Sequence, residues 1–275
     1  MASGENVYDF SRCKLCEENS AAPTYTLKNT TIYVCAACGF HFINHLDIVP
    51  PDNTSEDAQT LNRKSCDYIE SKLNENGKRH VKNLLLVRQY CSLSQSHSLD
   101  IGAGAGVFSN LMAKEGALVY AIEPQRIFRE FALKTFGISI NKETIDDQHW
   151  QEGFAGFFNI ITLWDVLEHV NFPAEMLKHA YNVTREGGWL FLDTPCRDSV
   201  FYRIAEWSYR LSGGSQPLIF ESLYSSQPYR HKQIFTRLQL IQLVEDIGFS
   251  VISMNTSFFK SQNKMILVCR KPLSA

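Results

Sequence analysis

The sequence predicts an α/β fold, in which helices pack on a sheet of mainly parallel strands, and three stretches support this prediction. Residues 98–108 pass from a short apolar run through three glycines spaced two apart into a helical pattern. That order is typical of a strand, a tight turn and a helix start, because glycine takes the positive φ angles that such turns need. Two more apolar runs, residues 118–122 and 158–164, are each followed by an acidic residue. Ligands of open α/β sheets bind beyond the carboxyl ends of the strands, so these residues mark the predicted site.

Length and composition describe one full α/β domain with a small appendage. The chain has 275 residues, of which 44% are hydrophobic and 20% charged, as in an ordinary globular protein. No apolar run approaches the length of about 18 residues that a membrane span needs. The N-terminus lacks the basic and then apolar pattern of a signal peptide, so we expect a cytoplasmic location.

Four cysteines near the N-terminus predict a structural zinc site. They form two C-x2-C pairs separated by 18 residues, namely Cys13, Cys16, Cys35 and Cys38. In a chain without a secretory signal this spacing favours four thiolate ligands over two disulfides or unrelated thiols. Between the pairs, residues 24–27 and 31–34 look like short strands, so we expect a zinc ribbon over residues 1–48. All four ligand positions are filled, which leaves no open position for catalysis.

The N-terminal appendage is acidic. Residues 1–61 hold three basic side chains against eight acidic ones, and the whole chain has a formal net charge of −2. Phosphate binding needs clustered lysines and arginines, so this charge argues against a nucleic-acid partner. We expect a polar linker over residues 49–61 and the main domain over residues 62–275.

The glycine turn differs from the common nucleotide-binding turns. The dinucleotide fingerprint G-x-G-x-x-G fails, because its third glycine would fall on Val107 or Ser109. A P-loop is also absent, since no Gly-Lys-Ser/Thr follows. The pattern of residues 100–106, Asp-x-Gly-x-Gly-x-Gly, resembles instead the first motif of class I S-adenosylmethionine (SAM)-dependent methyltransferases.

Two further motifs extend this resemblance. Residues 118–122 lead into Glu123, to which the resemblance assigns the hydrogen bonds from both ribose hydroxyls of the cofactor. Residues 160–170 are similar to the family's fourth motif. In related enzymes the loop at residues 143–147 passes the adenine, although a solvated loop charge is the alternative for its Asp146. The resemblance thus implies these cofactor-binding residues: Asp100, Gly102, Ala103, Gly104, Gly106, Glu123, Pro124, Asp146 and Asp165.

The rest of the domain follows a regular order. Helices are expected at residues 61–90, with a break at Asn76-Gly77, and at residues 127–136, 173–182 and 236–247. Further strands are expected at residues 138–140, 189–193, 249–254 and 265–270. The resemblance implies a Rossmann-like sheet of seven strands in the order 3-2-1-4-5-7-6, of which the last two form an antiparallel hairpin. Tyr68, in the first helix, could reach the site, but a packing role is favoured.

An insertion over residues 196–233 separates the fifth strand from the last helix. It is rich in aromatic residues, and its Gly213-Gly214 pair offers a hinge. Insertions on a rigid scaffold often carry substrate specificity. We therefore expect a helical lid over the acceptor pocket, with a packing contact or a homodimer contact as the alternative.

Residues after the fourth strand are the candidates for proton transfer. Asp165, Glu168 and His169 share one face at helical spacing. An unperturbed histidine has a pKa of about 6.5, which suits a base for an enol, phenol or sugar hydroxyl. His169 is the first candidate base, with Glu168 orienting it, and His231, near the end of the insertion, is the second. The alternative is that Glu168 and His169 only organise the loop.

The combination of a four-cysteine ribbon and this domain resembles a group of small-molecule methyltransferases, which includes zinc-containing sugar C-methyltransferases and enzymes of quinone pathways. The sugar enzymes carry a further C-terminal domain that this sequence lacks, which favours O-methylation of a small hydroxyl compound. Some quinone-pathway members bind a divalent ion near the equivalents of Glu168 and His169. No third ligand is evident here, so we do not expect a catalytic metal.

Two other functions stay open at this point. A ribosomal-RNA methyltransferase can also carry an N-terminal zinc module, but the acidic ribbon argues against it. A binding or regulatory protein could keep the fold without turnover. The intact glycine turn and Glu123 argue against that second alternative, because an inactive site has no physical need for them.

Overall fold

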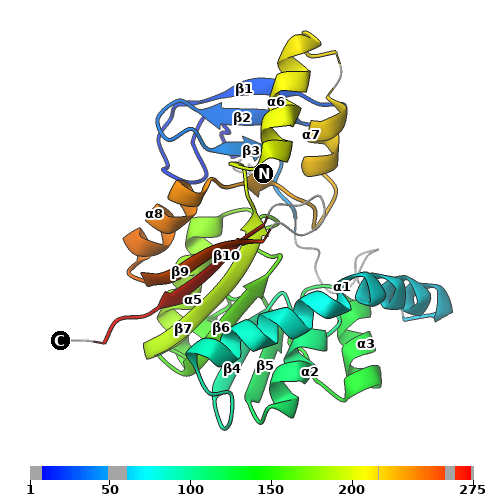
Figure 1. Cartoon of the computed structure of the whole chain (residues 1–275), viewed down its shortest axis with the longest axis vertical. Coiled ribbons are helices and arrows are strands. Elements are labelled where there is room, and N and C mark those ends of the chain that lie inside the picture. Colours follow the sequence, from blue (N-terminus) through cyan, green and yellow to red (C-terminus); the bar gives the residue numbers. More distant parts are fainter. Residues whose placement is uncertain (1–7, 49–60, 216, 258–263, 274–275) are drawn as a thin grey trace, which may run out of the picture.

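The computed structural model describes residues 8–48, 61–215, 217–257 and 264–273. Almost all of the predicted linker at residues 49–61 therefore lies outside the described residues. Two sheets make up the structure: a small one near the N-terminus and a large central one (Figure 1).

The central sheet has six strands in the order β5-β4-β6-β7-β10-β9. They are β4 (His97–Ile101), β5 (Leu118–Ile122), β6 (Phe158–Trp164), β7 (Thr184–Pro195), β9 (Ser250–Ser257) and β10 (Lys264–Arg270). The first four in the order pair in parallel, and β10 is antiparallel to both of its neighbours. The predicted antiparallel hairpin at the end of the chain is confirmed.

Of the seven predicted strands, the one expected at residues 138–140, on the edge of the sheet, does not form among the described residues. After α3 (Arg126–Phe136) the N–H group of Ile138 still donates to Ala132 O, at 3.4 Å, so this residue belongs to the helix end. Only Asn141 reaches β5, through a single parallel bridge to Ile122. The few residues between the end of α3 and Asn141 are too short a segment both to end the helix and to form a strand.

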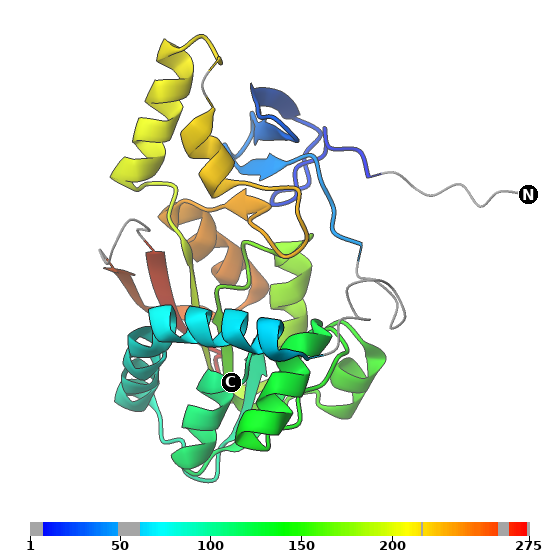
Figure 2. The same cartoon turned by 90° about the vertical axis from the view of Figure 1, so that its right-hand side faces the viewer.

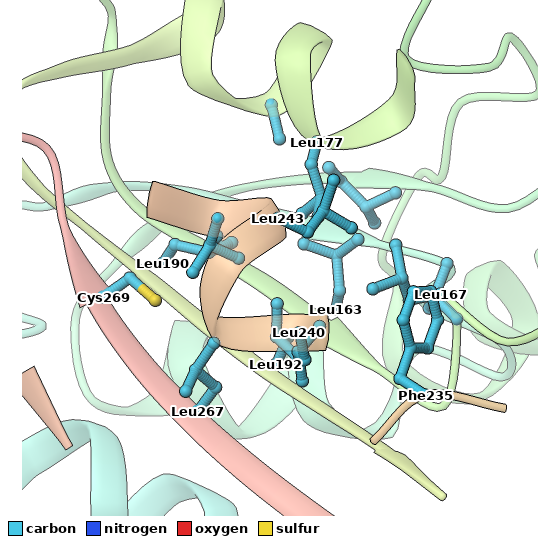
Figure 3. Packing of buried hydrophobic residues seen from close by; sticks show 14 of the residues in the cluster. Leu163, Leu167, Leu177, Leu190, Leu192, Phe235, Leu240, Leu243, Leu267 and Cys269 are labelled. Carbon is cyan, nitrogen blue, oxygen red and sulfur yellow. The ribbon is translucent and has the colours of Figure 1, made fainter. Parts of the chain in front are cut away.

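Helices cover both faces of the central sheet. Neighbouring side chains on a strand point to opposite faces. Thus Ile160 packs with α1 (Arg63–Tyr90) and α2 (Val107–Lys114), whereas Ile161 packs with α5 (Pro173–Val183) and α8 (Arg237–Ile247). Figure 3 shows the leucines of the second face, which come from β6 and the loop after it, β7, β10, α5 and α8. Both faces of the parallel strands are therefore buried, as in other α/β folds.

The first helix is continuous, so the predicted break at Asn76-Gly77 is wrong. Helix α1 runs through 28 residues and begins with a capping box, in which Asn62 and Ser65 bond to each other's backbone N–H groups. A glycine inside a helix costs only about 1 kcal/mol. The buried side chains of Ile69 and Val87, one on each side of the glycine, anchor the helix to the domain and offset that cost.

The small sheet has the order β1-β2-β3-β8, and each neighbouring pair is antiparallel. Its first three strands come from the predicted ribbon: β1 (Ala21–Thr26), β2 (Thr31–Cys35) and β3 (His41–Ile43). The fourth, β8 (Gln233–Ile234), follows the insertion. The ribbon predicted at residues 1–48 is thus completed by a segment from the far part of the chain.

The helices of the insertion pack on this small sheet. They are α6 (Val200–Leu211) and α7 (Leu218–Leu223), and both lie beside the ribbon strands in Figures 1 and 2. Their buried side chains share one core with ribbon residues: Tyr25, Leu27, Ile32, Ile43, Tyr202, Ala205, Phe220, Tyr224 and Ile234. Inside it, Tyr202 Oη bonds to His41 Nδ1 at 2.7 Å and to Tyr224 Oη at 2.8 Å. These two helices therefore pack on the ribbon, which was the alternative to a lid over the acceptor pocket.

Truncation of Phe220 tests this shared core. Its ring is 1% exposed and lies 4.8 Å from the ring of Tyr25. We expect Phe220→Ala to lower the free energy of unfolding by about 3–5 kcal/mol, because it removes a buried aromatic ring. Trp207→Ala, on the outer side of α6, should change it by less than about 0.5 kcal/mol. Urea unfolding followed by circular dichroism measures both, and equal effects would contradict a core shared by ribbon and insertion.

Candidate active site

A cavity of about 460 Å³ opens at the carboxyl end of the parallel strands. Its wall includes the residues that follow three strands, among them Gly102 after β4, Glu123 after β5 and Asp165 after β6. Helix α5 lines another side through Met176 and His179. This is the edge at which open α/β sheets bind their ligands.

Gly102 of the glycine turn forms part of this wall, whereas Gly104 and Gly106 do not. The three glycines differ in what surrounds them. All three have positive φ, at 70°, 51° and 75° for Gly102, Gly104 and Gly106. A Cβ on Gly102 would lie 2.5 Å from Val166 Cγ2, and one on Gly106 would lie 2.8 Å from Ala132 Cβ. A Cβ on Gly104 would meet no atom within 4 Å. Packing therefore requires the first and third glycines, while the middle one borders open space that a ligand can fill.

Asp100 supports the turn from below and does not line the cavity. Its carboxylate accepts hydrogen bonds from Ser109 Oγ and Thr162 Oγ1, both at 2.7 Å. The side chain is buried, and burial raises its pKa to about 6. The neighbouring Ala103 is likewise absent from the cavity wall.

Glu123 stands at the tip of β5, where the sequence places it. Its carboxylate accepts hydrogen bonds from the N–H groups of Gly104 and Gln125, both at 2.9 Å. It is 5% exposed, and burial raises its pKa to about 7. Pro124 and Asp146 line the same part of the cavity. This end therefore offers one carboxylate and one glycine backbone side by side.

Asp165 is held in an ion cluster that sequence reasoning missed. Its backbone is left-handed, with φ of 57°, and its N–H group donates to Asp193 Oδ1 at 2.7 Å. Arg79 from α1 and Lys264 from β10 pair with its carboxylate. Arg79 also pairs with Asp193 at 2.9 Å. Of the partners of Asp165, only Asp193 could have been placed near the site from the sequence, because it ends the fifth predicted strand.

The structure brings the three candidate catalytic residues together. Glu168 and His169 follow β6, and His231 precedes β8. His169 Nε2 lies 4.0 Å from Glu168 Oε1, and the two histidine rings are 4.9 Å apart, measured between their centroids. His169 lines the cavity, whereas Glu168 is fully buried and His231 is not part of the cavity wall. Tyr68 is 51% exposed and also lies outside this wall.

Burial controls the charge of this cluster. It raises the pKa of Glu168 to about 8 and lowers the pKa of His169 to about 3. Burial also lowers the pKa of His231, whose Nδ1 lies 3.0 Å from Leu223 O. If Nδ1 carries the proton and donates it to that carbonyl, Nε2 keeps its lone pair. At neutral pH both imidazoles are uncharged.

Within the described part of the chain, two groups of side chains could hold a metal ion. The sulfur atoms of Cys13, Cys16, Cys35 and Cys38 all lie within 4.8 Å of one another. Two of their separations are 3.6 Å, close to the edge of about 3.8 Å expected for a tetrahedral zinc site. Ligand atoms of Glu168, His169 and His231 meet the same limit. The sequence shows no third ligand beside Glu168 and His169, but folding places His231 there.

Asp47 joins three segments above the cavity. Its backbone N–H donates to Asn171 Oδ1 at 2.8 Å, and its carboxylate accepts from the N–H group of Tyr229 at 2.9 Å. Lys232, which is fully buried, pairs with the same carboxylate at 3.0 Å. Both Asp47 and Tyr229 line the cavity. The end of the ribbon and the end of the insertion thus close one side of the site.

Comparisons with known proteins agree with this geometry. A family model described as a methyltransferase domain matches residues 64–254. The ubiquinone biosynthesis O-methyltransferase of Pseudomonas aeruginosa (strain LESB58) is 30% identical over 123 residues, which are 43% of this chain and 53% of that protein. The chain spans about half the length of the curated relatives it matches.

Solved structures show the same fold. A SAM-dependent methyltransferase from Methanosarcina mazei has a TM-score of 0.54 and 16% identity, covering 69% of this chain and 98% of that chain. Magnesium protoporphyrin IX methyltransferase from Synechocystis PCC 6803, with bound S-adenosylhomocysteine (SAH), has a TM-score of 0.51 and 16% identity, covering 78% and 89%. The chain therefore belongs to the methyltransferase domain family and has the class I SAM-dependent methyltransferase fold.

Proposed function

We propose that this protein transfers the methyl group of SAM to a hydroxyl group of a small-molecule acceptor. The observation that carries the proposal is one cavity with two different ends. Gly102 and Glu123, whose carboxylate accepts from the N–H group of Gly104, line one part of the wall, and the neutral imidazole of His169 lines another. The matched O-methyltransferases support a hydroxyl acceptor.

The first end suits an adenosine group. The ionised carboxylate of Glu123 can accept hydrogen bonds from two ribose hydroxyls, and the uncrowded Gly104 lets a ligand approach the backbone. We assign the adenine contact to Asp146, which lines the cavity from the loop before α4 (Gln148–Gly153). When bound, SAM supplies an electrophilic methyl group. We assign the acceptor to the part of the wall that His169 lines.

Proton removal is the role that we assign to His169. Methyl transfer is an in-line displacement, so the attacking hydroxyl must be aligned and must lose its proton. A neutral imidazole in the cavity wall can accept that proton. Glu168 and His231 are the neighbours to which we assign the orientation of this ring, since Glu168 Oε1 lies 4.0 Å from His169 Nε2 and the His231 ring 4.9 Å from its centroid. Asp47 and Tyr229 form part of the same wall.

The four cysteines have a structural role in this proposal. Four thiolates hold zinc in a closed site, and a ribbon this small needs the metal in order to fold. We expect metal analysis of the pure protein to find about one zinc ion per chain. Cys35→Ser should lose the metal, whereas Cys91→Ser, which lies outside the cluster, should keep it. Well under one zinc per chain in the unmodified protein would refute the zinc site.

Cofactor affinity should depend on pH through Glu123. Its carboxyl has a pKa of about 7 in the free protein, so it is mostly neutral at pH 6 and ionised at pH 8. Ribose hydroxyls donate to the ionised form, so calorimetry should show SAH binding about ten-fold more weakly at pH 6 than at pH 8. Glu123→Gln should bind weakly at both pH values. If SAH affinity of Glu123→Gln depended on pH as it does in the unmodified protein, Glu123 would be excluded as the origin of that dependence.

Replacing His169 should slow methyl transfer without weakening cofactor binding. With tritiated SAM and a panel of phenols and catechols as acceptors, we expect His169→Gln to lower kcat by about 100-fold or more. The Kd for SAH should stay within about two-fold of its original value. His149→Gln, an exposed histidine of α4 outside the cavity wall, is the matched control and should keep full activity. If His169 only organises the loop, the variant will lose SAH affinity and stability together with kcat.

A further inference from the structure

Asp47, the last acidic residue of the ribbon, brings a negative charge to the cavity wall. Its side chain is 12% exposed. Its backbone exchanges two hydrogen bonds with the side chain of Asn171, at 2.8 and 2.7 Å. Asn171 follows closely after His169 in the sequence, and both residues line the cavity. Asp47 therefore belongs to the part of the wall that we assign to the acceptor.

The positive partner of Asp47 is not part of the cavity wall. Lys232 is fully buried, and its Nζ lies 3.0 Å from Asp47 Oδ1. The same ammonium group donates to the carbonyl oxygens of Gln227 and Ser225, at 2.6 and 3.2 Å. An ammonium group has three donors, so Lys232 uses all of them within the protein. A ligand in the cavity therefore meets the carboxylate of this pair and not the lysine.

The other charged side chains of the described cavity wall are also carboxylates. They are Glu123, Asp146, Asp165 and Glu175. Neither lysine nor arginine is found among the described residues of this wall. Arg79 and Lys264 pair with Asp165, but both lie outside the wall. An anionic group on the acceptor would thus meet like charges, without a cation of the wall to pair with it.

His45 does not change this balance above neutral pH. Its Nε2 lies 3.2 Å from Asp47 Oδ1. Burial lowers the pKa of His45 below the ordinary histidine value of about 6.5, so its imidazole is uncharged at about pH 8. At that pH the carboxylate of Asp47 has Lys232 as its charged partner, and the imidazole can only donate a hydrogen bond.

We propose that Asp47 selects the acceptor by charge, so that the site takes uncharged or cationic hydroxyl compounds and rejects anionic ones. Like charges repel strongly when they are close together and partly removed from water. Carboxylic acids and phosphorylated compounds therefore belong to the rejected class. The ribbon then contributes to acceptor recognition through Asp47, besides its structural role. This inference rests on the proposed transfer of a methyl group to a hydroxyl group.

Three catechols of similar size test the preference with the unmodified protein. Hydroxytyrosol, dopamine and dihydroxyphenylacetate carry an uncharged, a cationic and an anionic side chain, each separated from the ring by at least one methylene group. With tritiated SAM at about pH 8, kcat/KM should be about 100-fold lower for dihydroxyphenylacetate than for the other two. Equal values for all three, or a preference for dihydroxyphenylacetate, would overturn the proposal.

Replacing Asp47 should relax this selection. Asp47→Asn removes the charge, keeps an oxygen that can accept from the N–H group of Tyr229, and leaves the ammonium of Lys232 without its carboxylate. We expect kcat/KM for dihydroxyphenylacetate to rise by about ten-fold and that for dopamine to fall. Asp47→Glu, which keeps the charge, should still reject the anion. Asp246→Asn, an exposed aspartate outside the cavity wall, is the matched control and should keep the original preference.

Binding measurements separate a failure of this inference from a failure of the proposed reaction. If none of the three catechols is methylated, methyl transfer to such hydroxyls is refuted, and calorimetry on the SAH complex still measures the charge preference. Hydroxytyrosol and dopamine should bind at least about ten-fold more tightly than dihydroxyphenylacetate. Indistinguishable binding of all three, or an Asp47→Asn variant that is folded by circular dichroism and keeps the original preference, would exclude charge selection by Asp47.

Discussion

The two-residue strand β8 is the contact on which the arrangement of the site depends. On one side it pairs with β3 of the ribbon. On the other side, the N–H group of Lys232, just before the strand, donates to Glu168 O at 2.7 Å. The side-chain amide of Gln233 donates to Leu167 O and Val170 O, at 2.9 and 2.6 Å. The loop after β6 and the ribbon are thereby fixed to the same backbone, which brings His231 to His169.

Local patterns predicted most of the nucleotide-binding half of the fold. The glycine turn, the acidic residue after β5 and the strands that carry them are specified by neighbouring residues, and these lie where the sequence indicated. The prediction of an edge strand at residues 138–140 was wrong, because a local β pattern could not show that the N–H group of Ile138 still bonds to Ala132 O of the preceding helix. The prediction of a helix break at Asn76-Gly77 was wrong because tertiary packing on both sides of the glycine outweighs its weak helix propensity.

The other half of the site depends on contacts between residues far apart in the sequence. Arg79 meets Asp165 and Asp193, and Asp47 meets Tyr229 and Lys232, without any spacing that would indicate it. The same holds for the insertion. Its aromatic residues predicted a helical element, but an amphipathic pattern does not say which surface it covers, and α6 and α7 cover the ribbon.

Burial of ionisable groups marks the site as a region selected for something besides stability. Glu123 and Glu168 both have their pKa raised into the neutral range because they are removed from water. His169 is kept neutral for the same reason. A core built only for stability would hold apolar residues at these positions, because an unbalanced buried carboxyl costs free energy. The three groups nevertheless share one small region at the carboxyl edge of the sheet.

The pairing of β3 with β8 also has a consequence for synthesis of the chain on the ribosome. Phe42 and Gln233 are partners, although about 190 residues separate them. The first three ribbon strands leave the ribosome early, yet the edge of β3 has no partner until almost the whole methyltransferase domain has been made. Early metal binding by the cysteines would keep this nascent ribbon compact during that interval. The last contacts to form would then be those that bring His231 to Glu168 and His169.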